Sequence, residues 1–150
     1  MRAVVQRVTD ADVSVDSKIT GKIGKGIVAL IGVGAEDQES DIDYIAKKLV
    51  NLRIFDDENG VMNRSIKDIG GEILAVSQFT LLGDARGGNR PSWFKAAKPE
   101  IAVEMYNKLV EKLKNEYSIH VEEGVFQAEM LVRINNDGPV TILFDSQKLF

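Results

Sequence analysis

The sequence predicts an α+β fold, with a single domain over residues 1–150 in which mostly antiparallel β-sheets form a barrel-like core with two main helices. Alternating apolar and polar residues near both ends of the chain predict strands, and two segments between them repeat apolar residues at helical spacing. No linker, internal repeat or low-complexity tract interrupts the 150 residues. A domain of this length buries roughly 68–70% of the surface of its unfolded chain, which is enough for one substantial core.

Residues 1–34 predict a β-meander. Residues 4–9 and 11–15 alternate between two faces, and Gly21, Gly24 and Gly26 mark the hairpins that follow. The run from Gly26 to Gly34 is almost entirely apolar, which predicts a strand covered on both faces.

Two helices are predicted. The first begins at Ser40, with Asp41 and Asp43 in its first turn, and continues to about Arg53. The second begins at Pro99, because proline is well accepted in the first turn of a helix. Helical spacing predicts the buried positions, which are Ile42, Ile45, Leu49 and Leu52 in the first helix and Ala102, Met105, Tyr106, Leu109 and Leu113 in the second.

The remaining strands are shorter. Residues 73–76 lead a second buried strand into Ser77–Leu81, and residues 56–60 form a turn. Residues 118–122, 125–134 and 140–145 predict three closing strands.

Composition narrows the function. The chain has no cysteine, so it has no disulfide framework and no thiolate nucleophile, as suits a reducing cytoplasm. Its longest strongly apolar stretch, residues 27–33, is far too short to span a bilayer, and no signal peptide precedes it. A net charge of −4 argues against broad coating of nucleic acid, although it leaves room for a local contact with one RNA end.

Two segments carry the candidate chemistry, Ser77-Gln78-Phe79-Thr80-Leu81 and residues 136–141. Neither contains a histidine, a cysteine or a cluster of carboxylates, so an enzyme built on them works by positioning and backbone hydrogen bonds. Thr80 is a weak nucleophile without an adjacent base, and a structural hydroxyl is its simpler interpretation. Gln78 shares a strand face with Thr80, and the backbone N–H groups of Phe79 and Thr80 are candidates to stabilise an oxyanion.

The other candidate groups are weaker. His120 is the only histidine, and strand alternation puts it on a wet face with Ser118 and Glu122, which is typical of a surface residue. Histidine is the commonest metal ligand in proteins, and the only one here is assigned to the surface, so we expect neither a metal nor a cofactor. Gly138-Pro139 interrupts the strand register, because proline lacks a ladder donor. It is either an edge or bulge with a trans bond, or a pair of carbonyl groups held rigidly toward a ligand.

Residues 83–98 form a polar, glycine-containing loop and the one basic region of an acidic chain. Four cations face a single carboxylate, Asp84, and Trp93-Phe94 add apolar surface beside them. A solvated loop is one interpretation. The other is contact with a terminal nucleotide through phosphate and stacking, made by Arg86, Arg90, Lys95 and Lys98.

Taken together, these segments resemble the D-aminoacyl-tRNA deacylase family, of the D-tyrosyl-tRNA deacylase type. The similarity covers nearly the whole chain. It is carried by residues 1–8, 52–55, 62–65, 76–81, 89–92, 124–126 with Met130, and 136–141. The Ser-Gln-Phe-Thr and Gly-Pro-Val-Thr motifs are specific in combination.

The resemblance implies a homodimer with its sites at the subunit interface and a substrate of tRNA charged with a D-amino acid. A cis Gly138–Pro139 bond would reach into the partner's pocket as a chiral filter beside the catalytic residues Ser77, Gln78, Phe79 and Thr80. Arg7 would orient that loop, and Phe126 and Met130 would contact substrate. The ester to the terminal adenosine would be hydrolysed without a metal, in cytoplasmic tRNA proofreading, with the ribose 2′-OH as an alternative to attack by Thr80. Glycine, lacking a side chain, would partly escape the filter.

Two positions depart from the family pattern. Gln127 replaces the usual glycine after Phe126, and Trp93 replaces the usual phenylalanine. Two other functions stay open on the residues alone. One is a non-catalytic dimeric module that binds small metabolites or RNA ends, and the other is an amidase that uses Thr80 as its nucleophile.

Overall fold

The computed structural model describes all of residues 1–150 and confirms the α+β fold with two main helices. The helices are α1 (Glu39–Asn51) and α2 (Pro99–Asn115), and a 3₁₀ turn, η1, covers Phe79–Leu82. The strands are β1 (Arg2–Val15), β2 (Lys18–Ile23), β3 (Gly26–Gly32), β4 (Phe55–Asp56), β5 (Met62–Arg64), β6 (Glu72–Ser77), β7 (Val121–Glu123) and β8 (Leu131–Asp145).

The main sheet has the strand order β2-β1-β3-β6-β7, and β8 pairs with the other edge of β1. The β3–β6 and β6–β7 pairs are parallel, whereas the pairs of β1 with β2, β3 and β8 are antiparallel. β7 returns beside β2, where the Thr20 hydroxyl lies 3.5 Å from the Glu123 carbonyl oxygen. The sheet therefore nearly closes into a barrel, as predicted.

The predicted meander over residues 1–34 is wrong. β1 is long enough to take two partners on one edge, with residues 2–8 pairing with β3 and residues 11–15 pairing with β2. Consecutive strands β2 and β3 consequently lie end to end along β1 and do not pair with each other.

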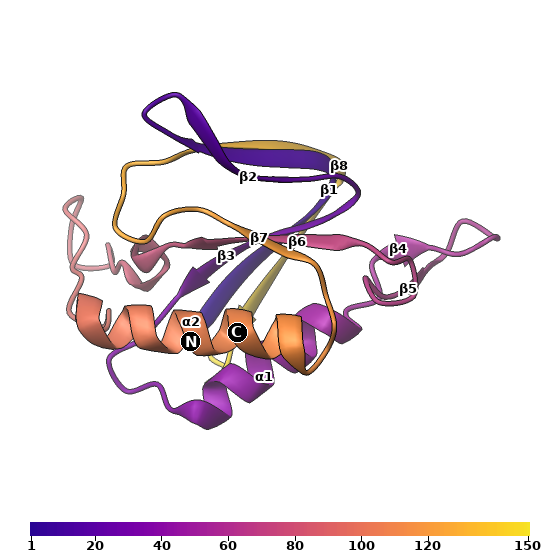
Figure 1. The fold of residues 1–150 in the computed structure, drawn as a ribbon. Helices are drawn as coiled ribbons and strands as arrows, with labels where there is room; N and C mark the ends of the chain where they lie inside the picture. The colour runs from indigo at the N-terminus through magenta and orange to yellow at the C-terminus, as the bar shows by residue number, and fades with distance from the viewer.

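Two hydrophobic clusters cover the two faces of the sheet. The larger lies between the sheet and both helices, which occupy the same side of it (Figure 1). The smaller fills the barrel and comprises Val8, Ala11, Val13, Ile23, Val28, Leu74 and Val76. In β3, Ile27 and Ala29 belong to the first cluster and Val28 to the second, which confirms a strand covered on both faces.

The helix boundaries follow from their end residues. α1 starts at Glu39, one residue before the prediction, and the Asp41 carboxylate accepts the N–H of Gln38 at 2.7 Å. It ends at Asn51, two residues earlier than expected. α2 starts at Pro99 as predicted, and all five predicted apolar positions of α2 are buried.

Three strand predictions need correction. β6 ends at Ser77, and the expected strand to Leu81 is instead the η1 turn. Of the expected strand 118–122, only residues 121 and 122 lie in β7, which continues to Glu123. Residues 125–130 of the predicted strand 125–134 lie in no strand, and residues 131–134 join the predicted strand 140–145 in one strand, β8, because β1 pairs with it on both sides of Pro139.

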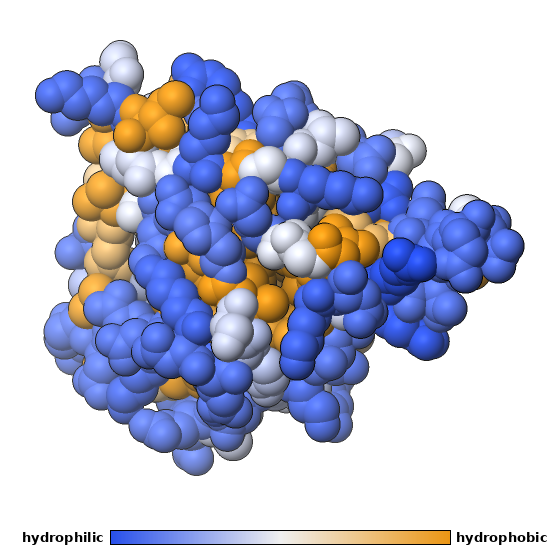
Figure 2. All heavy atoms as spheres, turned by 45° about the vertical axis from the view of Figure 1, so that its right-hand side comes forward, coloured by the Kyte–Doolittle hydropathy of each residue, from blue (hydrophilic) through white to orange (hydrophobic).

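The surface is mostly hydrophilic, but apolar side chains gather in a hollow on the face shown in Figure 2. Leu131 and Leu143 of β8 are 58% and 56% exposed. Neither helix has the length and apolar surface that a bilayer crossing requires.

Candidate functional site

A pocket of about 600 Å³ opens where β3 and β6 end beside the start of α2. β6 runs parallel to β3 up to the pairing of Ser77 with Ile31, so both strands deliver their ends to the same edge. The lining residues are Ile31, Val33, Val76, Ser77, Gln78, Phe79, Trp93, Ala96, Ala97, Pro99, Ala102, Tyr106, Phe126, Gln127, Ala128, Met130 and Val132. The pocket thus collects Ser77, Gln78 and Phe79 with Phe126 and Met130, which the sequence placed far apart.

The pocket contains no carboxylate, histidine, lysine or arginine side chain. Its one titratable group is Tyr106, whose hydroxyl donates a hydrogen bond to the Ala75 carbonyl oxygen at 3.0 Å. Burial, with the negative charge of Glu123 as a smaller contribution, raises the pKa of Tyr106 well above its usual value. The phenol therefore stays protonated and provides no general base in the neutral range.

Ser77, Gln78 and Phe79 line one edge of this pocket, whereas the predicted catalytic residue Thr80 is exposed and lies outside its lining. The Gln78 N–H donates to the Ile31 carbonyl oxygen at 2.7 Å, and the Gln78 side-chain amide donates to the Thr80 hydroxyl. Phe79 is 56% exposed and meets Trp93 edge to face, with ring centroids 5.2 Å apart.

The first N–H groups of η1 are free. A 3₁₀ helix provides no internal acceptor for its leading N–H groups, and the Phe79 and Thr80 N–H groups have none elsewhere in the chain. Two adjacent free donors beside an apolar pocket suit the stabilisation of a negative oxygen.

The segment 126–130 forms the opposite wall. Phe126 packs against Tyr106 with ring centroids 6.3 Å apart. Gln127 has φ 63°, a left-handed backbone conformation that residues other than glycine rarely adopt. Its neighbours on both sides line the pocket, so this turn shapes the wall.

The filter segment, residues 136–139, is separate from this pocket. Gln6 pairs with Thr141 and Val8 pairs with Asn136, so the four residues 137–140 oppose the single residue Arg7. They bulge out of the sheet, as expected where proline lacks a ladder donor. Gly138 and Pro139 are exposed, line no part of the pocket and are joined by a cis bond, as the resemblance implies.

Arg7 fixes the filter segment. Its Nε donates to the Asp137 carbonyl oxygen at 3.3 Å and its Nη1 donates to the Ile54 carbonyl oxygen at 2.7 Å, while the side chain is only 11% exposed. On the other side, the Asn136 side-chain amide donates to the carbonyl oxygens of Arg7 and Val140 at 2.9 and 3.0 Å. Both ends of the bulge are therefore held by side-chain hydrogen bonds.

Gly138 is required by this geometry. Its φ is 117°, and a Cβ added there would lie 3.0 Å from the Val140 nitrogen and 3.1 Å from an Arg7 guanidinium nitrogen. A side chain at this position would therefore strain the backbone and displace Arg7.

The basic residues of loop 83–98 do not act as one group. Asp84 accepts two hydrogen bonds from the Arg86 guanidinium, at 2.9 and 2.6 Å, and these hold the pKa of Asp84 well below its usual range. Arg90 and Lys98 are exposed and form no ion pair. Lys95 lines a different cavity, of about 280 Å³.

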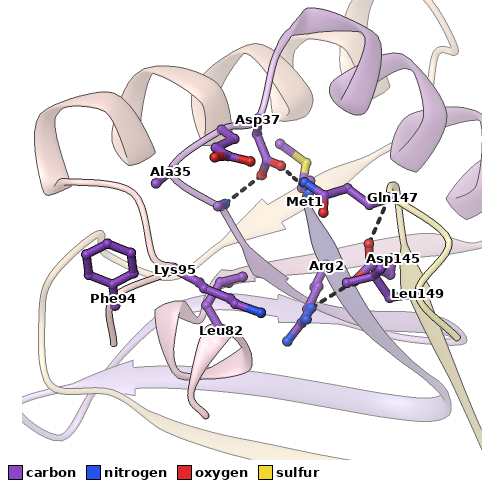
Figure 3. A pocket seen from close by; sticks show the side chains of 12 residues that line it. Met1, Arg2, Ala35, Asp37, Leu82, Phe94, Lys95, Asp145, Gln147 and Leu149 are labelled. Atoms are coloured by element: carbon purple, nitrogen blue, oxygen red, sulfur yellow. Dashed lines mark hydrogen bonds and ion pairs between the residues drawn. The ribbon is translucent and has the colours of Figure 1, made fainter. Parts of the chain in front are cut away.

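In that second cavity Arg2, Asp37 and Asp145 are paired, whereas Lys95 forms no ion pair. In Figure 3, Lys95 points toward Arg2, and Arg2 donates to the buried Asp145 carboxylate at 2.9 Å. Asp37 accepts from the Met1 amino group and from the Gly34 N–H. These contacts tie β1 to β8 and to the start of α1, so the cavity has a structural explanation.

His120 is 59% exposed, with its Nε2 3.3 Å from Glu72 and 3.4 Å from Glu122. It lies outside the pocket, as expected. The structure gathers no group of three or more histidine or carboxylate side chains that could hold a metal ion.

Sequence reasoning missed two contributors. Tyr106 was assigned only to the core, yet it also lines the pocket. The spacing of apolar residues along a helix does not show which buried residue also borders a cavity. Asn136 was noted only as part of a motif, and its amide bridges the bulge. An asparagine just before a glycine-proline bulge is a usable signal for such a bridge.

Comparison with known proteins gives the family. The sequence pattern described as D-Tyr-tRNA(Tyr) deacylase matches residues 4–145. Curated proteins called D-aminoacyl-tRNA deacylase from Fervidobacterium nodosum and Thermosipho melanesiensis are 58% and 57% identical, over 100% of both chains in each case.

Solved structures agree on the fold. A c-Myc DNA unwinding element binding protein superposes with a TM-score of 0.92 at 42% identity, covering 97% of this chain and 98% of that one. A probable eukaryotic D-amino acid tRNA deacylase superposes with a TM-score of 0.79 at 16% identity, covering 95% and 97%. The chain belongs to the D-Tyr-tRNA(Tyr) deacylase family.

Proposed function

We propose that the 600 Å³ pocket holds the ester between a D-amino acid and the 3′-terminal adenosine of tRNA, and that two copies of the chain complete each site. The family acts on aminoacyl-tRNA, and this enzyme is a D-aminoacyl-tRNA deacylase. The observation that carries the proposal is a pocket of ester size with polar groups at one edge and no charged side chain.

The chemistry is ester hydrolysis by positioning. A water oxygen attacks the ester carbonyl carbon, the carbonyl oxygen becomes negative, and the bond to the ribose 3′-oxygen then breaks as that oxygen takes a proton. The free N–H groups of Phe79 and Thr80 stabilise the negative oxygen, with Ser77 and Gln78 placing the ester. Correct placement alone lowers such barriers by roughly 7–11 kcal/mol.

The ribose 2′-OH takes the part of the missing side-chain base. It lies next to the scissile ester in every aminoacyl-tRNA. Neither Tyr106 nor any other residue that lines the pocket offers a general base in the neutral range. With the 2′-OH of the substrate in this role, the protein need not supply a base.

Chirality is read by a second copy of the chain. The filter segment is fixed by Arg7 and Asn136, exposes Gly138 and Pro139, and lines no part of its own pocket. β8 pairs only with β1 and leaves its other edge free along 15 residues, and a long free edge is suited to association. Docked across such an edge, the Gly138 and Pro139 carbonyl groups would block an L side chain in the partner subunit's pocket.

Glycine is the expected exception. A steric filter rejects a side chain, so a glycyl ester passes it and is hydrolysed more slowly than a D-ester only because it lacks contacts with the pocket wall. Arg86, Arg90, Lys95 and Lys98 contribute RNA contacts around the pocket. We place this proofreading in the cytoplasm and assign it to residues 1–150 as one catalytic domain.

The decisive experiment compares D-tyrosyl-tRNA, L-tyrosyl-tRNA and glycyl-tRNA as substrates of the same preparation. Release of D-tyrosine with L-tyrosyl-tRNA left intact supports the filter, and equal hydrolysis of both enantiomers refutes it. Binding of all three without release would identify a non-catalytic module instead. Sedimentation of the active fraction as a single subunit would refute the shared site.

Thr80→Ala separates positioning from attack by threonine. Positioning predicts residual hydrolysis, because the backbone N–H groups remain. A threonine nucleophile predicts complete loss and a burst of acyl-enzyme in the wild type. Replacing the terminal adenosine by 2′-deoxyadenosine removes the 2′-OH and leaves the ester on the 3′-oxygen, and unchanged turnover would exclude participation of the 2′-OH.

A further inference from the structure

A basic surface lies at the C-terminal end of α1, away from loop 83–98. We call Lys47, Lys48, Arg53 and Lys148 the α1 basic surface. All four are exposed. A cavity of about 410 Å³ lies among them, lined by Tyr44, Lys47, Lys48, Asn51, Leu52, Arg53 and Phe144, with no carboxylate in its lining.

None of these four cations forms an ion pair. The exposed cations elsewhere on the helices are neutralised by neighbours: Lys108 by Glu39 and Glu104, and Lys112 by Asp43 and Glu116. The end of a helix favours cations, but that explains at most the two lysines of α1. Arg53 follows the helix and Lys148 follows β8, so separate segments bring positive charge to one place.

Aromatic faces lie beneath this charge. The Lys48 ammonium lies 5.6 Å from the centroid of the Tyr44 ring and 6.0 Å from that of Phe144, and the Lys148 ammonium lies 6.0 Å from the Tyr44 ring. Tyr44 and Phe144 are half-buried, and the exposed cations lie over their rings. Unpaired cations over aromatic rings are suited to a nucleic-acid backbone.

The surface adjoins the filter segment. Arg7 donates to the carbonyl oxygen of Ile54, the residue after Arg53, and to that of Asp137, the residue before Gly138. Phe144 lies five positions beyond Pro139 on β8, or roughly 17 Å at the rise of a strand. Duplex nucleic acid carries a phosphate charge about every 1.7 Å along its axis, so a duplex that spans this separation carries several phosphates from the filter segment to the surface.

We propose that the α1 basic surface binds the acceptor-stem backbone of the tRNA whose ester occupies the partner subunit's pocket. The inference builds on the proposed function, because only in a shared site does the filter segment of one subunit border the ester held by the other. Each subunit then hydrolyses the ester on a tRNA that its partner holds.

The test uses two matched triple variants of the full chain. Lys47→Gln, Lys48→Gln and Arg53→Gln neutralise the surface. Lys18→Gln, Lys22→Gln and Lys25→Gln remove the same charge from three exposed, unpaired lysines in and beside β2, on the opposite side of the molecule from α1 (Figure 1). Each is assayed on D-tyrosyl-tRNA and on D-tyrosyl-adenosine, which has the ester but no stem.

For the surface variant we expect KM for D-tyrosyl-tRNA to rise roughly tenfold with kcat unchanged. The slope of log affinity against log salt should flatten by about 0.9 for each phosphate that the variant no longer neutralises. Turnover of D-tyrosyl-adenosine should be unchanged, as should every parameter of the β2 variant. Unchanged KM and slope in the surface variant, or an equal loss in both variants, would overturn the inference.

Failure of the proposed function gives a different result. If the wild type hydrolysed neither ester, affinity for uncharged tRNA would be measured instead. Weaker binding by the surface variant alone would support the RNA contact, and equal binding by all three proteins would overturn it.

Discussion

The pocket edge at residues 77–80 and the filter segment at residues 136–139 differ in how they are held. The first lines a cavity, but few contacts hold it, because Phe79 is exposed and two N–H groups are free. The second lines no cavity and is exposed, yet Arg7 and Asn136 fix it from both sides. An exposed segment that side-chain hydrogen bonds hold in place is suited to contact another molecule. An open pocket edge with free donors is suited to bind a ligand.

The largest effect should come from Gly138→Ala, which breaks the filter segment. The new Cβ conflicts with the backbone at Val140 and with Arg7, at a φ that alanine rarely adopts. Since a displacement of about 1 Å costs on the order of 100-fold in rate, we expect D-tyrosyl-tRNA turnover to fall by roughly that factor. Gly87→Ala is the control, because a Cβ there meets open space, and it should turn over normally. Equal rates in the two variants would contradict the role of the segment.

Arg7→Lys tests how the filter segment is held. Lysine keeps the charge but cannot donate to Asp137 and Ile54 at once. We expect the free energy of unfolding in a urea titration to fall by about 2 kcal/mol, with a lower D-to-L rate ratio. Arg133→Lys provides the comparison, since its ion pair with Asp12 is exposed and should change stability by less than about 1 kcal/mol. An undiminished D-to-L ratio in Arg7→Lys would argue against this anchor.

Tyr106→Phe probes the pocket side. It removes the hydrogen bond to the Ala75 carbonyl oxygen, which still accepts the Gly124 N–H, so we expect a loss of about 1 kcal/mol near neutral pH. The pKa of Tyr106 is raised in the folded protein, so its contribution is complete below the unfolded pKa of about 10 and is lost as pH rises above it. Unfolding titrations at rising pH should therefore show a shallower alkaline loss in the variant than in Tyr117→Phe. A loss of turnover beyond about 100-fold would instead mark the phenol as a catalytic acid.

The smallest effect should come from Gln127→Gly in the pocket wall. Relief of a left-handed backbone is worth about 1–2 kcal/mol, and the added freedom of the unfolded chain offsets about 0.4–1 kcal/mol of it. We expect a net stabilisation of about 0.5 kcal/mol, seen as a higher melting temperature. Gln147→Gly, at a position without positive φ, should not stabilise the protein. A destabilised Gln127→Gly would mean that the glutamine side chain contributes contacts that outweigh the strain.

Much of the fold followed from local patterns. Both helices, the doubly covered β3 and the bulge at Pro139 were predicted, because periodicity and proline act through neighbouring residues. The pairing of β1 was not, since which strands share an edge is set by strand length and closure across the whole sheet. The merging of the last two strands into β8 was missed for the same reason.

The site was predicted in pieces. The motif residues 77–79, Phe126 and Met130 do meet in one pocket, but no local pattern could show that Tyr106 reaches it. Charge counting gave the net charge of loop 83–98 but could not show that Asp84 pairs with Arg86 or that Lys95 lines a different cavity. The unpaired cations near α1 come from three segments, and only the folded chain brings them together.

The pairing of Arg2 with Asp145 has a consequence for synthesis. β1 (Arg2–Val15) is translated well before β8 (Leu131–Asp145), so at about 5–20 residues per second β1 waits on the order of 10 s for its longest partner. During that time one flank of β1 has nothing to pair with, and the barrel stays open. The β1–β8 pairing therefore forms only after β8 has been translated, and nascent chains that stall before residue 131 remain without it.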